Sequence, residues 1–228
     1  MNFSILFSLV TLLILAPLRP AFCDEPKHNF AQWEKEISAF EAKDRTNPPP
    51  QNGILFIGSS TIRLWTTLNQ DFPGLPIINR GFGGSEIADS THFADRIVFP
   101  YSPKSIFFRA GGNDIANGKS SQAVFADFEE FVTTVHAKLP DTEIYFISWS
   151  PTPLRWQNRD KERTLNNLVK DYANHAPHVK YIEADSMVLS ADGKPRAELY
   201  RDDKLHFNAA GYKLLAQRVR PFLPKPGN

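Results

Sequence analysis

A serine, a histidine and an aspartate in this chain could together hydrolyse an ester. Ser60 lies in the segment Gly-Ser-Ser-Thr at residues 58–61, directly after an apolar run. Asp203 and His206 stand three residues apart near the C-terminus. In a serine hydrolase the hydroxyl attacks the ester, an imidazole takes the hydroxyl proton, and a carboxylate orients the imidazole. These residue types predict a triad of Ser60, His206 and Asp203.

Ester hydrolysis also needs N–H donors aimed at the oxygen that becomes negative in the transition state. The backbone N–H of Ser60 is one candidate, because a serine at a strand-to-helix turn directs its N–H into the same space as its hydroxyl. Gly84 can bring a second backbone N–H close to a substrate because it has no Cβ. Asn113 offers a side-chain amide as a third donor. We therefore predict an oxyanion hole formed by Ser60, Gly84 and Asn113.

These residues can meet only if a sheet brings their loops together. Short β-rich runs predict strands at residues 54–59, 76–81, 105–111, 143–149 and 179–185. Helical patterns occupy residues 122–139, 159–176 and 209–222, with a less regular one at 86–97. This alternation predicts an α/β fold: a three-layer α/β/α sandwich around a doubly wound, flavodoxin-like parallel sheet of about five strands. Ligand-binding residues of such folds lie at the carboxyl ends of the strands.

The same segments resemble the SGNH hydrolase superfamily, often called GDSL esterases and lipases. The resemblance runs from about Ile54 to the C-terminus, and residues 58–61 match the family's Gly-Asp-Ser-Leu/Ile block with Ser59 in place of the aspartate. It implies a nucleophile at Ser60, oxyanion donors at Ser60, Gly84 and Asn113, and a catalytic Asp203–His206 pair. Gly-Gly-Asn-Asp at residues 111–114 matches the family's Gly-x-Asn-Asp block without departure. Residues 54–65 and 79–84 further resemble a bacterial, usually exported branch.

Several residues have competing interpretations. Ser59, Ser60 and Thr61 could simply cap the following helix. Ser85 is a rival nucleophile, although neither serine lies in the G-x-S-x-G motif of α/β-hydrolases. A rival pair, Asp89 and His92, also has the Asp-x-x-His spacing, but it falls within a helical pattern where such neighbours are often surface partners.

Two further side chains are candidates for substrate binding. Arg109 lies in an otherwise apolar strand, where a buried carboxylate could neutralise it or where it could hold an anionic substrate. We favour the structural role for Arg109. Trp156 lies in the loop after the fourth strand, where an exposed indole could stack on a sugar ring.

The N-terminal residues have a separate character. The apolar run from Ile5 to Leu18 is too short to span a bilayer and predicts a signal peptide at residues 1–23, hence export to the periplasm or the extracellular space. Cleavage there removes Cys23, the only cysteine, which excludes a thiol nucleophile. Residues 24–52 predict a helix and a proline-rich connector, and residues 53–228 the SGNH hydrolase domain.

Composition narrows the possible partners. The 228 residues include 26 Lys and Arg against 25 Asp and Glu, so a basic surface for nucleic acid or anionic membranes is not expected. No zinc, Walker A or dinucleotide motif is present, and no cofactor is implied. The expected function is hydrolysis of short-chain esters, most plausibly acetyl groups on carbohydrates. The alternatives are a lipid or thioester acylhydrolase and a non-catalytic flavin-binding domain. Oligomeric state is left open.

Overall fold

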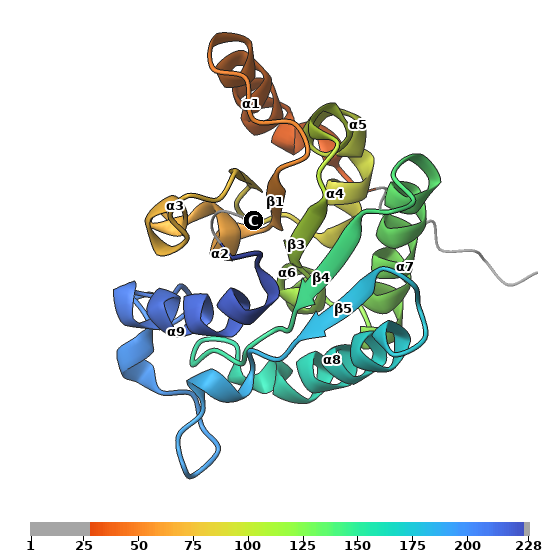
Figure 1. Ribbon diagram of the computed structural model, residues 1–228. Coiled ribbons are helices and arrows are strands. Elements are labelled where there is room, and N and C mark those ends of the chain that lie inside the picture. Colours follow the sequence, from red (N-terminus) through yellow and green to blue (C-terminus); the bar gives the residue numbers. More distant parts are fainter. Residues whose placement is uncertain (1–27, 226–228) are drawn as a thin grey trace, which may run out of the picture.

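The structure is a computed structural model that describes residues 28–225, whose five strands form one parallel sheet (Figure 1). The strands are β1 (Ile54–Gly58), β2 (Ile77–Gly81), β3 (Ser105–Arg109), β4 (Glu143–Ile147) and β5 (Val179–Ile182). Their order is β2-β1-β3-β4-β5, and every neighbouring pair is parallel. This is the flavodoxin-like order of a doubly wound fold, as the sequence predicted. All five carboxyl ends therefore lie at one edge of the sheet.

Side chains of the central strands alternate between two separate cores. Leu55 and Ile57 of β1 belong to one buried cluster, whereas Ile54 and Phe56 belong to the other. Successive residues of a strand point to opposite faces, and a continuous apolar run such as residues 54–57 fits a strand that is covered on both. The sheet is accordingly the middle layer of a three-layer sandwich.

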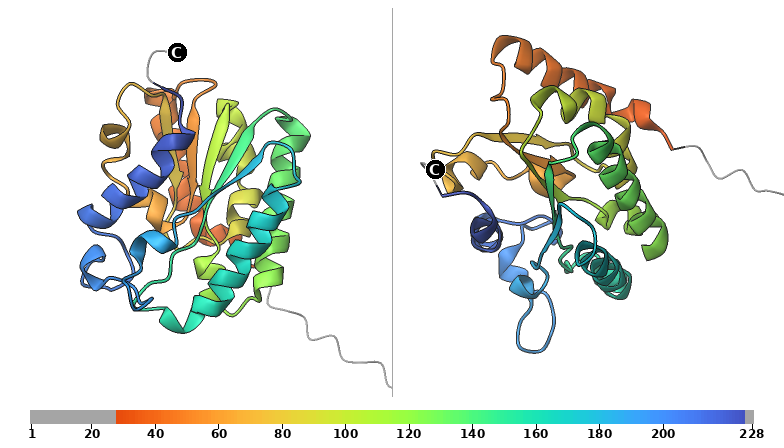
Figure 2. Two further views of the ribbon diagram at one scale, coloured as in Figure 1. Left: turned by 60° about the horizontal axis from the view of Figure 1, so that its bottom comes forward. Right: turned by 45° about the vertical axis from the view of Figure 1, so that its right-hand side comes forward.

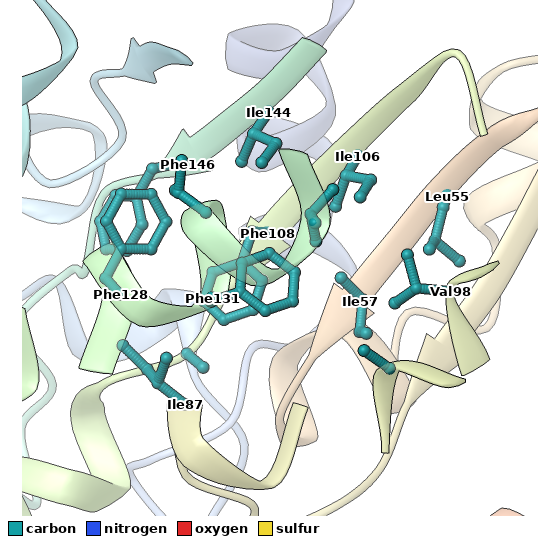
Figure 3. Packing of buried hydrophobic residues seen from close by; sticks show 14 of the residues in the cluster. Leu55, Ile57, Ile87, Val98, Ile106, Phe108, Phe128, Phe131, Ile144 and Phe146 are labelled. Atoms are coloured by element: carbon teal, nitrogen blue, oxygen red, sulfur yellow. The ribbon is translucent and has the colours of Figure 1, made fainter. Parts of the chain in front are cut away.

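The helices that cover one face of the sheet include α4 (Ile87–His92), α5 (Ala94–Ile97), α7 (Ser121–Lys138) and α8 (Arg159–Ala173). Figure 3 shows Phe128 and Phe131 of α7 against Phe108 and Phe146 of the sheet. The ring centroids of Phe108 and Phe131 are 4.5 Å apart. These aromatic contacts fix α7 across β3 and β4.

The opposite face is covered by α2 (Ser60–Arg63), α3 (Leu68–Asp71) and α9 (Ala209–Val219), which lie together on that side in Figures 1 and 2. The Trp65 ring, between α2 and α3, lies 5.6 Å from the ring of Tyr212 on α9. Tyr212 also donates its hydroxyl to the backbone oxygen of Thr61. This hydrogen bond joins the C-terminal helix to the segment that carries Ser60.

The N-terminal helical segment packs on the first of these faces. It consists of a 3-10 turn (Phe30–Trp33) followed by α1 (Glu34–Thr46). Ile37 of α1 is fully buried in the same cluster as Leu55 and Ile57. Arg96 of α5 pairs with Glu41 of α1 at 2.7 Å. The helix is thus part of the same core, while the predicted leader at residues 1–23 lies outside the described residues.

Within residues 28–225, none of the helices has the length and apolar character that crossing a membrane requires. The same part of the chain holds no group of three or more His, Cys, Asp or Glu side chains arranged to bind a metal ion.

Candidate active site

Ser60 is the first residue of α2 and lies at the carboxyl end of β1. The turn before it requires Gly58, whose φ is 137° and where an added Cβ would lie 2.1 Å from the backbone oxygen of Arg109. Ser59, the N-cap residue, makes no side-chain capping hydrogen bond. The Ser60 side chain is half-buried, so it remains reachable. Its backbone N–H is in the first turn, where no intrahelical acceptor exists.

The structure brings Ser60, His206 and Asp203 into one hydrogen-bonded chain. His206 Nε2 lies 3.0 Å from Ser60 Oγ, and His206 Nδ1 lies 2.7 Å from Asp203 Oδ2. An ionised carboxylate can only accept hydrogen bonds, so Nδ1 carries the proton and Nε2 accepts from the Ser60 hydroxyl. This is the tautomer that a general base next to a serine needs.

Asp203 is held in its ionised form. Desolvation opposes the charge, but hydrogen bonds from the His206 backbone and side chain and from the Leu205 N–H lower the pKa of Asp203 to about 2. Both backbone contacts to Asp203 Oδ1 measure 2.9 Å. Lys204, between these residues, has a φ of 56°, which folds the segment tightly enough for both N–H groups to face one oxygen.

Gly84 and Asn113 lie on the two neighbouring loops. Gly84 is exposed, with a φ of 84° that favours glycine, and an added Cβ would lie 3.1 Å from the Trp33 ring. Asn113 lies in the short helix α6 (Gly112–Ala116), directly after β3. Its Nδ2 donates to the backbone oxygen of Ser85 at 2.9 Å. One N–H of this amide therefore remains for an oxyanion.

Arg155 fixes which way the Asn113 amide points, and sequence reasoning did not identify it. Arg155 Nη1 donates to Asn113 Oδ1 at 3.0 Å and to the Gly112 backbone oxygen at 3.3 Å. A flipped amide would place an NH₂ group against the guanidinium. Arg155 follows β4 within a proline-containing loop, and no motif marked it in the sequence.

The competing residues make other contacts. Ser85 is fully buried and donates its hydroxyl to the Phe82 backbone oxygen at 2.9 Å. Asp89 accepts from the Glu86 N–H at 2.8 Å and lies 2.7 Å from His28 Nε2. The His92 ring instead stacks on Phe30, with centroids 3.9 Å apart. Asp89 and His92 thus do not form a catalytic pair in this arrangement.

A small pocket adjoins Ser60 and His206. Its other lining residues include Arg109, Asn113, Trp149 and Arg155, and its cavity volume is about 10 Å³. That is about the space of a single water molecule. Trp149 is buried and donates its indole N–H to Glu162 at 2.8 Å, which fixes this wall of the pocket.

Arg109 is 2% exposed and has no carboxylate within 4 Å among residues 28–225. It donates to the Ser148 backbone oxygen and, at 3.1 Å, to Ser150 Oγ. Its guanidinium carbon also lies 5.1 Å from the Trp149 ring centroid. Burial lowers the pKa of Arg109 to about 10, so the side chain is still charged at neutral pH. The sequence offered a buried carboxylate as a neutralising partner, but none forms an ion pair with Arg109 within residues 28–225.

Trp156, the other candidate for substrate binding, begins a 3-10 turn directly after Arg155. Its ring faces the Arg159 guanidinium, whose carbon lies 5.0 Å from the ring centroid. Trp156 is half-buried and is not among the side chains that line the pocket at Ser60. Any contact between Trp156 and a substrate would therefore lie outside this pocket.

A buried polar cluster of Glu86, Asp114, Lys119 and Asp127 contacts the start of α4, which directly follows the loop that carries Gly84. Asp114 Oδ1 accepts from the Ile87 N–H at 3.2 Å, and Lys119 Nζ pairs with Glu86 at 2.9 Å and Asp127 at 2.7 Å. Burial raises the pKa of Asp114 to about 7. The sequence marked Asp114 only as part of a motif, because its partners come from other elements.

Known proteins resemble this chain in sequence and in fold. Residues 58–214 match the model of the GDSL-like Lipase/Acylhydrolase family. The alpha1 subunit of platelet-activating factor acetylhydrolase IB from Bos taurus is 25% identical over 209 residues, covering 84% of this chain and 82% of the bovine protein.

Two solved structures illustrate the likeness in fold. A Streptococcus pneumonia protein provisionally described as a platelet activating factor has a TM-score of 0.75 and 21% identity, covering 86% of this chain and 94% of that chain. A variant of a Geobacillus acetyl-xylooligosaccharide esterase has a TM-score of 0.61 and 15% identity, and the match covers 78% of this chain and 97% of the esterase. The family match begins at Gly58, the last residue of β1, includes Ser60, Asp203 and His206, and ends within α9. The chain therefore belongs to the GDSL-like lipase/acylhydrolase family and is an ester-hydrolysing serine hydrolase.

Proposed function

We propose that this protein removes acetyl groups from esters, with Ser60 as the nucleophile. The observation that carries the proposal is the hydrogen-bonded chain from Ser60 Oγ through His206 to Asp203, at 3.0 and 2.7 Å. As Ser60 Oγ attacks the ester carbon, its proton passes to His206 Nε2, and the ionised Asp203 stabilises the imidazolium. The negative oxygen accepts from the N–H groups of Ser60, Gly84 and Asn113.

Collapse of this tetrahedral species breaks the bond between the carbonyl carbon and the alcohol oxygen. His206 Nε2 returns its proton to that oxygen, and the acyl group remains on Ser60. Water then attacks the acyl-enzyme with His206 again acting as the base, which releases the carboxylic acid. The one free N–H of Asn113 assists both steps, because its other hydrogen bonds stay as they are.

The size of the pocket supports a short acyl group. A cavity of about 10 Å³, about the space of one water molecule, favours a methyl group over a long alkyl chain. Two of the similar proteins also have acetyl in their names: the mammalian platelet-activating factor acetylhydrolase subunit and the Geobacillus acetyl-xylooligosaccharide esterase. Their names indicate different alcohols: platelet-activating factor, a lipid, for the first protein and a xylooligosaccharide for the second.

A carbohydrate is the alcohol component that we favour, with Trp156 as a stacking surface beyond the pocket. The similarity to the acetylhydrolase subunit supports a lipid as the second candidate. Replacing Trp156 with alanine is expected to raise KM for an acetylated sugar several-fold, about the effect of one stacked ring, and to change KM for a small aryl acetate less. The apolar run at residues 5–18 supports export as the setting for this activity.

A substrate panel tests the function. Hydrolysis of 4-nitrophenyl acetate and octanoate is compared with that of acetylated xylooligosaccharides and an acetylated ether phospholipid, with Ser60→Ala as the blank. We expect the acetate to be hydrolysed faster than the octanoate, and the acetylated oligosaccharide faster than the phospholipid. Preference for the phospholipid would favour the lipid assignment, and preference for octanoate would contradict the acetyl assignment.

A further inference from the structure

The pocket beside Ser60 has an unusual balance of charge. Arg109 and Arg155 both line it, and its lining includes no aspartate or glutamate. Neither arginine forms an ion pair within residues 28–225. A buried or half-buried cation without a partner costs free energy, and arginine matches the geometry of carboxylates and phosphates. The pocket is therefore positively charged beyond what its packing requires.

Two carboxylates act electrostatically on these arginines without pairing with them: Glu162 on both and Asp185 on Arg109. Glu162 and Asp185 act on Arg109 through charge, but neither approaches within 4 Å. Burial raises the pKa of Glu162 to about 7 and that of Asp185 to about 6. Each is thus partly protonated near neutral pH.

The two arginines differ in how many of their N–H donors remain available to a ligand. Arg109 is buried and its terminal nitrogens bind Ser148 and Ser150. Its Nε has no partner among the described residues but is itself buried, so Arg109 contributes mainly its charge. Arg155 is half-buried and only its Nη1 makes side-chain hydrogen bonds within the described part of the chain. Its Nε and Nη2 remain available as a two-pronged donor.

The loop that carries Arg155 is anchored at several points. The Arg155 N–H donates to Thr152 Oγ1 at 3.2 Å, and the Leu154 N–H donates to the Lys204 backbone oxygen at 3.0 Å. Tyr200 holds the start of the loop through the Pro151 backbone oxygen at 2.7 Å. A guanidinium fixed in this way binds an anion with little loss of side-chain entropy. A neutral donor would suffice to orient Asn113, so that contact does not account for the charge.

We propose that Arg155 binds an anionic group, a carboxylate or a phosphate, on the alcohol part of the ester, in the positive field of Arg109. This inference rests on the proposed function, because it assigns the substrate class of the same site. We place the anion beside the ester, on the side of Arg155, because the cavity at Ser60 has about the space of one water molecule. An acidic sugar and a phosphorylated alcohol both carry such a group.

Matched substrates test the charge alone. 3-Acetoxybenzoate and methyl 3-acetoxybenzoate carry the same aryl acetate, but only the first is an anion. 3-Acetoxyphenyl phosphate is the corresponding substrate with a phosphate in place of the carboxylate. The readout is the ratio of kcat/KM for the anion to that for the neutral ester. We expect the ratio to exceed about 10 in the wild type, since charge-assisted hydrogen bonds are strong. The larger of the carboxylate and phosphate ratios identifies the preferred anion.

Variants separate recognition from positioning. Arg155→Gln is expected to lower kcat for every ester through Asn113 and, in addition, to reduce the ratio about tenfold or more. Arg155→Lys should retain part of the ratio. Arg159→Gln is the matched control, because Arg159 is close in sequence, faces Trp156 and does not line the pocket. The kcat/KM ratio of Arg159→Gln should stay within about twofold of the wild-type ratio, since a charge outside the pocket is partly screened by solvent.

A wild-type ratio of one or less, or an Arg155→Gln variant with an unchanged ratio, would overturn the proposal. An equal loss on both esters would restrict Arg155 to positioning Asn113. Binding to the Ser60→Ala variant gives a readout that does not depend on turnover. Calorimetry should show 3-hydroxybenzoate binding more tightly than its methyl ester, and addition of Arg155→Gln should abolish the difference. Equal binding of the two would reject the anion site, whereas absence of wild-type hydrolysis alone would reject the esterase function.

Discussion

The Ser60 side chain is reachable from solvent and contributes little to the packing of the protein. Its hydroxyl contacts His206 at 3.0 Å and caps no helix, so removing it leaves the core unchanged. We expect Ser60→Ala to lower kcat for 4-nitrophenyl acetate by several orders of magnitude, as loss of a nucleophile does in comparable triads. The free energy of unfolding should change by less than about 0.5 kcal/mol.

His206→Ala should match the loss in Ser60→Ala, because the two act as one unit. His92→Ala is the control: its ring stacks on Phe30 and is remote from the Ser60 pocket lining. Full activity in Ser60→Ala, or a comparable loss in His92→Ala, would contradict the assigned base and nucleophile.

Asn113 should affect the transition state more than substrate binding. Its amide is held between Arg155 and the Ser85 backbone oxygen, so its free N–H needs no reorganisation during the reaction. We expect Asn113→Ala to lower kcat by about 10² to 10³ with little change in KM. Steady-state kinetics with an aryl acetate measures both constants. A rise in KM alone would instead make Asn113 a ground-state binding residue.

The sequence could indicate Ser60, Asp203 and His206 because their types and spacing carry chemical meaning. It could not indicate Arg155, whose role depends on a contact with Asn113 across 42 positions. The partners of Arg109 could not be predicted from the sequence either. Its place in an otherwise apolar strand suggested burial, but only the folded chain shows that it contacts two hydrogen-bond acceptors and an aromatic ring rather than pairing with a carboxylate.

At the scale of elements, strong patterns located the long helices and all five strands. The 122–139 and 159–176 patterns correspond to α7 and α8, and the predicted strand starts agree within one residue. A helix was expected directly after the Gly-Ser-Ser-Thr segment, where α2 lies, but its bounds were not predicted. The short helices α3 and α6 were not predicted at all, since four or five residues carry too little periodicity. The packing of α1 was not readable either, because its contacts with α5 and β2 join residues distant in sequence.

The start of α9 links helix stability to catalysis. Asn208, its N-cap, accepts from the N–H groups of Ala210 and Gly211 and donates to the Tyr200 backbone oxygen. Asn208→Ala should cost about 1 kcal/mol of unfolding free energy. It should also lower kcat about tenfold, because the turn that positions His206 lies two residues away.

Ser120→Ala provides a matched control for this element. Ser120 caps α7 by accepting from the Ala123 N–H at 3.1 Å, and it does not line the pocket at Ser60. Its loss should reduce stability by a similar amount while kcat stays constant. Urea denaturation and initial rates measure the two quantities separately. Equal kcat in both cap variants would show that Asn208 does not position the catalytic turn.

On the scale of the whole molecule, two apolar cores hold the sheet while ionisable groups gather at its carboxyl edge. Asp114 and Glu162 are both nearly inaccessible, and burial raises the pKa of each to about 7. Asp203 has the opposite shift, to about 2. The fold therefore contains acids whose effects on stability have opposite dependence on pH.

The signs of these shifts predict how stability varies with pH. Between the ordinary carboxyl pKa and about 7, folded Asp114 and Glu162 keep protons that the unfolded chain has released, so unfolding free energy falls as pH rises through this window. Asp203 contributes stability above its ordinary pKa that is lost as pH falls toward 2.

We expect urea denaturation to show greater stability at pH 5 than at pH 8. Asp114→Asn and Glu162→Gln should each reduce that difference, because neither amide ionises, whereas Asp203→Asn should leave it unchanged. A wild type that is more stable at pH 8, or amide variants with the full pH dependence, would show that these buried carboxyls ionise freely in the folded protein.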